Sequence, residues 1–123
     1  MLLLKATLFI LLFTFSFGAF AQKGSLLEKG IQSFEAGNKQ EALNYFNQHL
    51  VKVPGSTAAY YNRAQVYFAM DSLILALEDL SYAEPDFGNQ AKFWQLKGLV
   101  LMKLERYQDA ILTFDKTLEL NFL

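Results

Sequence analysis

Residues 57–90 read TAAYYNRAQVYFAMDSLILALEDLSYAEPDFGNQ, and residues 91–123 read AKFWQLKGLVLMKLERYQDAILTFDKTLELNFL. The two stretches align when one is shifted by 34 positions, and the residues before position 57 align at the same shift. The shared positions hold a small residue, an alanine and a large apolar residue: Gly30, Ala64 and Gly98; Ala42, Ala76 and Ala110; Phe46, Leu80 and Phe114. A repeat of this length predicts a stack of three similar units.

Each unit predicts two helices. The alanine of each unit and the large residue four positions later lie on one side of a helix, and the small residues let two helix axes approach closely. We expect helices at about 26–36, 39–52, 58–70, 73–84, 90–104 and 107–120. No period-two alternation competes with this pattern, so the sequence predicts an all-α fold.

Start and stop signals agree with these helices. Ser25 and Glu28 form a capping-box pattern, and Gly37 followed by Asn38 is expected to end the first helix and cap the second. Pro54 and Pro85 are expected to end the second helix of units one and two, because proline cannot continue a helix.

This pattern resembles the tetratricopeptide repeat, a helix–turn–helix unit of 34 residues. Trp94, Gly98, Ala110 and Phe114 match the tryptophan, glycine, alanine and phenylalanine of that repeat. The resemblance implies a right-handed α-solenoid of three repeats, at about 23–56, 57–90 and 91–123, whose first helices line a concave face. It also implies a scaffold that binds another protein or a peptide segment, and not an enzyme.

The chain departs from the family pattern at several positions. Lys29, Arg63 and Lys97 stand where the family has leucine, and His49 stands where a small residue is usual. Phe122 stands where the third unit should have proline.

The family's register predicts which residues face the concave groove: Leu27, Ile31, Phe34, Tyr61, Asn62, Gln65, Phe68, Lys92, Gln95, Leu99, Met102 and Lys103. Family members that grip a carboxy-terminal carboxylate use two lysines, two asparagines and an arginine at five groove positions. Those positions hold here Leu27, Ile31, Asn62, Lys92 and Leu96. Only Asn62 and Lys92 match, which disfavours a chaperone tail as the ligand.

The groove residues instead favour an apolar helix or an extended strand with an acidic end near Lys92 and Lys103. An alternative stays open at this point. Ile31, Phe34, Phe68, Leu99 and Met102 are also suited to pack against neighbouring first helices, and they would then form core instead of a groove.

Residues 1–21 have the layout of a secretory signal peptide: Lys5, an apolar run, and an Ala19-Phe20-Ala21 end. We expect cleavage between Ala21 and Gln22, which leaves a repeat domain over residues 22–123 with no membrane contact. The protein is then expected in the periplasm or outside the cell, and the expected source is a Gram-negative bacterium. The alternative is an uncleaved amino-terminal anchor, and it also exports the rest of the chain.

Composition excludes several classes of function. A chain of 123 residues fits one domain, and a net charge of −1 makes nucleic acid an unfavourable partner. Cysteine is absent from the sequence and His49 is its one histidine, so we expect no catalytic site, no metal site and no cofactor. His49 is expected to pack between helix pairs with one nitrogen hydrogen-bonded. The neighbouring acids Glu78-Asp79 and Glu84/Asp86 are expected to lie on solvated faces and helix ends.

The last predicted helix carries an apolar stripe of Ile111, Phe114 and Leu118. Repeat arrays need a polar outer face on their terminal element. We therefore expect a homo-oligomer formed through this helix or a partner that covers it, unless the chain is a piece of a longer repeat array. A structural subunit that self-associates is thus the alternative to a peptide-binding scaffold.

Overall fold

The structure is a computed structural model that describes residues 24–122, and these residues form six helices and no strand. The helices are α2 (Leu26–Glu35), α3 (Lys39–Lys52), α4 (Thr57–Ala69), α5 (Leu73–Phe87), α6 (Ala91–Lys103) and α7 (Tyr107–Asn121). The expected all-α fold is confirmed for this part of the chain. The signal peptide and its cleavage site lie outside the described residues.

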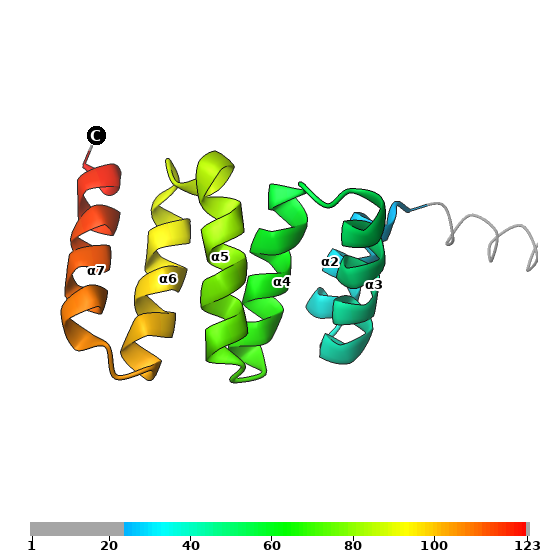
Figure 1. Cartoon of the computed structure of the whole chain (residues 1–123), viewed down its shortest axis with the longest axis horizontal. Coiled ribbons are helices and arrows are strands. Elements are labelled where there is room, and N and C mark those ends of the chain that lie inside the picture. Colours follow the sequence, from blue (N-terminus) through cyan, green and yellow to red (C-terminus); the bar gives the residue numbers. More distant parts are fainter. Residues whose placement is uncertain (1–23, 123) are drawn as a thin grey trace, which may run out of the picture.

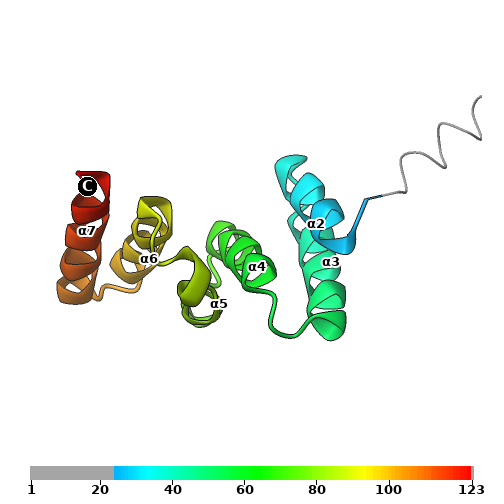
Figure 2. The ribbon, with the colours of Figure 1, turned by 90° about the horizontal axis from the view of Figure 1, so that it is seen from above.

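The helices form three hairpins that stand side by side in chain order (Figure 1). The hairpins are α2–α3, α4–α5 and α6–α7, and contacts between α3 and α4 and between α5 and α6 join them. Seen from above, successive helices step back and forth across the row (Figure 2). The chain therefore stacks as a helical repeat with the 34-residue period of its sequence.

Within each hairpin a small residue on the first helix faces a large residue on the second. The ring of Phe46 covers Gly30 so closely that a Cβ atom at position 30 would lie 2.5 Å from its Cε1 atom. Phe114 covers Gly98 in the same way, at 2.6 Å. In the middle hairpin, alanine and the smaller leucine take these two positions. The expected close approach of the helix axes is thus confirmed.

The turn inside each hairpin contains one residue with a left-handed backbone. Gly37, Asp71 and Glu105, spaced by 34 positions, have φ angles of 86°, 61° and 60°. The Ser25–Glu28 capping box is present, with each side chain accepting a hydrogen bond from the other residue's backbone N–H. Asn38 stands at the start of α3, but its side chain makes no capping hydrogen bond, so that part of the expectation was wrong.

Pro85 does not end α5, contrary to the sequence-based prediction, because the helix continues to Phe87. Proline lacks the N–H that would bond to the carbonyl one turn back, and its ring crowds that carbonyl, but the last turn keeps other bonds. The N–H of Gly88 donates to the Glu84 carbonyl at 2.8 Å, and the Phe87 ring stacks on Tyr61 with ring centroids 4.5 Å apart. The tertiary contact of Phe87 therefore extends the helix past the proline.

The buried apolar residues form two clusters. The larger cluster joins α4, α5 and α6 and includes Ala64, Leu80 and Phe93, each with no exposed surface. The smaller joins α2, α3 and α4 around Phe46 and Val66. Each cluster includes residues from both hairpins that it joins, so the hairpins depend on one another for burial.

Candidate functional site

The residues predicted to face the groove lie on the first helices of the hairpins, α2, α4 and α6. We call this set of twelve residues the first-helix face. Eight members are half-buried: Leu27, Ile31, Phe34, Tyr61, Asn62, Gln65, Phe68 and Leu99. Four are exposed: Lys92, Gln95, Met102 and Lys103. The assignment of this set to partner binding stays a prediction.

The aromatic members of the first-helix face are also part of the core. Tyr61 stacks on Phe87 and lies 6.3 Å, centroid to centroid, from Phe93. Burial raises the pKa of Tyr61 above its ordinary value. Phe68 packs against the same cluster. The two interpretations of these side chains are therefore compatible, because each half-buried ring packs with one side and leaves the other accessible.

The apolar members on α2 behave in the same way. Leu27, Ile31 and Phe34 pack against the cluster of Phe46 and Val66 while keeping part of their surface exposed. A substitution at these positions would therefore change packing as well as the surface that a partner meets.

The charges of the first-helix face are distributed unevenly. Lys103 donates to Asp71 at 2.9 Å, and its ammonium lies 5.2 Å from the centre of the Phe68 ring. Lys92 is exposed and makes no ion pair with another residue of the range 24–122. The Asn62 amide donates to the Ala58 carbonyl at 2.8 Å, which leaves its oxygen available as an acceptor. An acidic group on a ligand would thus find its least neutralised cation at Lys92.

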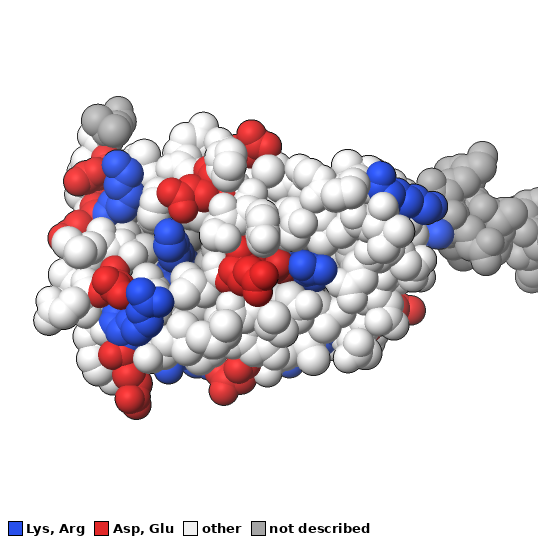
Figure 3. Space-filling model, in the orientation of Figure 1, with Lys and Arg blue, Asp and Glu red and all other residues white. Residues whose placement is uncertain are grey.

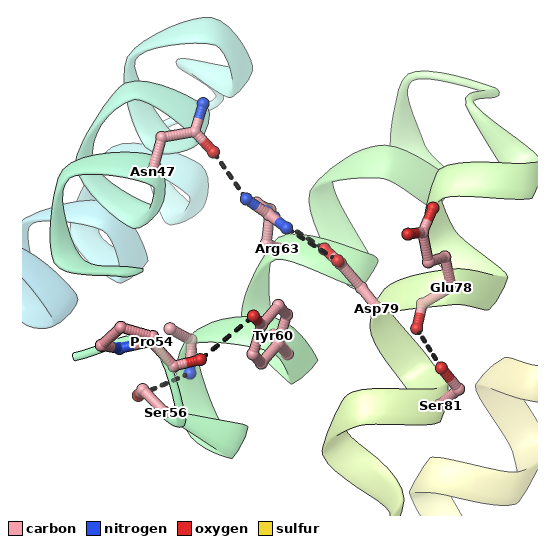
Figure 4. A network of polar contacts seen from close by, with 9 residues as sticks. Asn47, Pro54, Ser56, Tyr60, Arg63, Glu78, Asp79 and Ser81 are labelled. Carbon is pink, nitrogen blue, oxygen red and sulfur yellow. Dashed lines mark hydrogen bonds and ion pairs between the residues drawn. The ribbon is translucent and has the colours of Figure 1, made fainter. Parts of the chain in front are cut away.

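An ion pair within the middle hairpin, hydrogen-bonded also to the first hairpin, is the main polar feature that the sequence analysis missed. Arg63 on α4 donates to both carboxylate oxygens of Asp79 on α5, at 2.7 and 2.8 Å, and to Asn47 on α3 at 2.8 Å (Figure 4). Tyr60 and Tyr67 lie under its guanidinium, each ring centre 5.5 Å away. The hydrogen bonds to Asp79 raise the pKa of Arg63 above its ordinary value.

The expectation that Asp79 lies on a solvated face was therefore wrong. Its side chain is 4% exposed, whereas its neighbour Glu78 is exposed as expected. Glu84 was also expected at a solvated helix end, and it is half-buried and accepts from Lys97 at 3.3 Å. The signal in the sequence was the basic residue at the same position of every unit, because a cation inside a repeat array needs an acceptor nearby.

His49 is half-buried, and its Nε2 atom lies 3.1 Å from the Ser56 hydroxyl. The expected packing of His49, with one hydrogen-bonded nitrogen, is confirmed. Residues 24–122 contain no group of three or more histidine, aspartate or glutamate side chains placed to bind a metal ion. The described residues thus show no arrangement from which metal chemistry could be argued.

Three surface hollows lie away from the first-helix face. The first, of about 430 Å³, lies between α5, α6 and α7 and is lined by Leu77, Lys97 and Leu112 among others. The second lies beside Lys29 on α2 and α3, and the third beside Trp94 and Pro85. None of these hollows includes a residue of the first-helix face.

The surface is mixed in charge. On the face seen in Figure 3, lysine and arginine side chains alternate with aspartate and glutamate instead of forming one basic stripe. Within the described part of the chain, no helix has the length and apolar character needed to cross a bilayer.

Comparison with known proteins agrees with this geometry. Residues 91–122 match the family model described as "Tetratricopeptide repeat". The human protein "Tetratricopeptide repeat protein 12" is 29% identical over 97 residues, which is 79% of this chain and 14% of that protein. The chain thus spans about a seventh of the length of this relative.

Two solved structures illustrate the similarity of fold. The first repeat domain of Spaghetti (RPAP3), solved with the HSP90 peptide SRMEEVD, has a TM-score of 0.71 at 25% identity and covers 77% of this chain and 75% of that one. MamA has a TM-score of 0.72 at 24% identity, covering 77% and 56%. The chain has the tetratricopeptide-repeat fold, and the comparisons support a repeat protein of that kind.

Proposed function

We propose that this chain is an exported scaffold that holds a segment of another protein on its first-helix face. The observation that carries the proposal is the half-buried apolar row of α2, α4 and α6, interspersed with amides at Asn62, Gln65 and Gln95. Such a surface offers apolar contact area together with hydrogen-bonding groups that fix the orientation of a bound segment. The peptide seen on the first repeat domain of Spaghetti (RPAP3) supports this use of the fold.

The ligand that fits differs from that peptide. Leu27 and Ile31 replace two polar residues of the carboxylate-gripping members, and Lys103 is engaged by Asp71. We propose a segment with apolar side chains along α2 and α4 and one acidic group near Lys92. No catalytic step is needed for this function.

Export is the second part of the proposal. It rests on the apolar run and the Ala19-Phe20-Ala21 end of the sequence, and it places the scaffold in the periplasm or outside the cell. The partner would then be another exported or envelope protein.

A second candidate function is self-association as an assembly subunit. It is supported by four large side chains on one side of α7 that are more than half exposed, Tyr107, Ile111, Leu118 and Phe122. Light scattering at increasing protein concentration separates the two candidates, because only an assembly subunit is expected to grow in mass without another protein.

Affinity capture from envelope extract of the producing cells tests the scaffold. Lys92 and Met102 are exposed, so Lys92→Glu with Met102→Glu should leave folding intact and abolish capture of a distinct protein. Ile74→Glu, at a residue of α5 that is 66% exposed, is the matched control and should capture like the parent. Equal capture by both variants would contradict the first-helix face as the binding surface.

A further inference from the structure

The second helices α3, α5 and α7 present one surface three times. The residues at equivalent positions are Leu43, Leu77 and Ile111; Phe46, Leu80 and Phe114; and Leu50, Glu84 and Leu118. On α3, covered by α4, Leu43 is 7% and Leu50 is 9% exposed. On α7, Ile111 is 55% and Leu118 is 54% exposed. Two copies of the surface therefore show what kind of element covers it.

The covering helices, α4 and α6, share an apolar pattern. Val66 of α4 is fully buried in the cluster of Leu43 and Phe46, and Ala59, seven residues earlier, is also fully buried. At the equivalent positions of α6, Phe93 and Val100 are fully buried in the cluster that contains Leu80. Residues seven apart lie on the same face of a helix, so two apolar side chains seven apart define the contact.

The covering helices also share a cation between these two apolar residues. Arg63 of α4 donates to Asn47 of α3 at 2.8 Å, and Lys97 of α6 donates to Glu84 of α5 at 3.3 Å. On α7 the position of Asn47 is taken by Asp115, which is exposed and makes no ion pair within residues 24–122. The third surface therefore offers a carboxylate where the first offers an amide oxygen.

We propose that the α7 outer face, formed by Tyr107, Ile111, Asp115, Leu118 and Phe122, docks an amphipathic helix of a different protein. The docking helix carries an apolar residue, a lysine or arginine four positions later, and a second apolar residue three positions after that. Its apolar side chains cover Ile111 and Leu118, and its cation pairs with Asp115. This surface is separate from the first-helix face of the proposed scaffold, and it is the surface that the self-association candidate would use, with a different occupant.

A second copy of this chain fits the α7 outer face poorly. Head-to-tail stacking would place α2 on it, and the three pattern positions there are Ser25, the N-cap residue of α2, followed by Lys29 and Gln32. Two polar side chains would then cover Ile111 and Leu118. Symmetric pairing of two α7 helices would bring two Asp115 carboxylates near the two-fold axis, where like charges repel. The chemistry therefore favours a different protein that carries the full pattern.

The probe is a helix-stapled peptide of residues 56–70 of this chain, because it carries the pattern as Ala59, Arg63 and Val66. In the folded chain this segment packs on α3, which has Phe46 and Leu50. The equivalent residues of α7 are of the same types, Phe114 and Leu118, whereas α5 has Leu80 and Glu84. Stapling on the solvent side is needed because a free helix of this length is marginal in water. Binding is measured by fluorescence anisotropy on the purified protein.

We expect Ile111→Asp to weaken binding of this peptide at least tenfold, and Lys92→Glu on the first-helix face to leave it unchanged. Asp115→Lys should weaken binding of the parent peptide about threefold to fivefold. The same variant should strengthen binding of the peptide that carries Arg63→Glu by a similar factor. Ile111 and Asp115 are both exposed, so the variants should fold, and circular dichroism checks this.

Three results would overturn the proposal. One is a peptide that does not bind, and another is binding that Ile111→Asp leaves unchanged. The third is a concentration-dependent dimer in sedimentation that Ile111→Asp abolishes, because a second copy would then be the occupant.

Discussion

Replacing Gly30 by alanine should destabilise the protein, although glycine is a poor helix former. At an exposed helical position this change would stabilise by about 1 kcal/mol. Here the new methyl group would lie 2.5 Å from the Phe46 ring, which is fully buried and has no room to withdraw. Overpacking of this kind costs about 1–3 kcal/mol. Set against the gain of about 1 kcal/mol in helix propensity, we expect a net loss of up to about 2 kcal/mol in urea unfolding followed by circular dichroism.

The middle hairpin supplies the compensating change, because alanine at position 64 faces a leucine at position 80. Phe46→Leu alone should also destabilise, since it leaves a gap above Gly30. Combining it with Gly30→Ala rebuilds the alanine–leucine pair of the middle hairpin. The double variant should be more stable than the sum of the single changes predicts, by about 1 kcal/mol or more.

Gly98→Ala is the matched control for Gly30→Ala. Phe114 covers Gly98 as closely as Phe46 covers Gly30, but Phe114 is half-buried and its ring can move toward solvent. The loss should therefore be smaller than at Gly30. Two results would refute the size-matched packing of the hairpins. One is a Gly30→Ala variant that is more stable than the parent, and the other is a double variant whose stability equals the sum of the two single changes.

Three further predictions concern an ion pair, a turn and the signal peptide. Asp79→Ala should cost about 3–5 kcal/mol in urea unfolding, because it leaves the Arg63 charge without its carboxylate, and Arg63→Leu in the same chain should recover most of the loss. Glu105→Gly should raise the free energy of unfolding by about 1 kcal/mol, because the left-handed backbone at φ 60° suits glycine. Gly37→Ala, at the equivalent turn, should lower it, and thermal unfolding measures both changes. Intact-mass measurement on protein from an exporting host should show Gln22 as the first residue, and a mass that includes residues 1–21 would support an uncleaved anchor.

The helices and their pairing could be predicted from the sequence because the repeat presents the same signals three times. Five of the six predicted helices end within one residue of the observed ends. The end of α5 could not be predicted, because it depends on the stacking of Phe87 on Tyr61, a contact between two helices. The buried position of Asp79 was missed for a similar reason. The recurring cation signals that an acceptor lies nearby, but only the packing of α4 on α5 shows that Asp79 accepts from Arg63.

The candidate site was predictable only as a set of positions. The register places the twelve residues on α2, α4 and α6, but it does not show that Tyr61 and Phe68 pack into the core with one side. Nor does it show that Asp71 engages Lys103, because Asp71 lies in a turn outside the repeat's helical pattern. Local periodicity thus gives the face of a helix, while the chemistry of that face depends on its neighbours.

Site-specific photo-crosslinking tests the central claim most directly. A photoreactive amino acid at Gln95 or Met102 reports on the first-helix face, and the same amino acid at Val51 or Ile74 reports on exposed positions of the second helices α3 and α5. We predict that crosslinking in the producing cells gives one discrete adduct to another exported protein from Gln95 and Met102, and none from Val51 and Ile74. Adducts only from the second helices, or only between copies of this chain, would contradict a scaffold that binds its partner on the first-helix face.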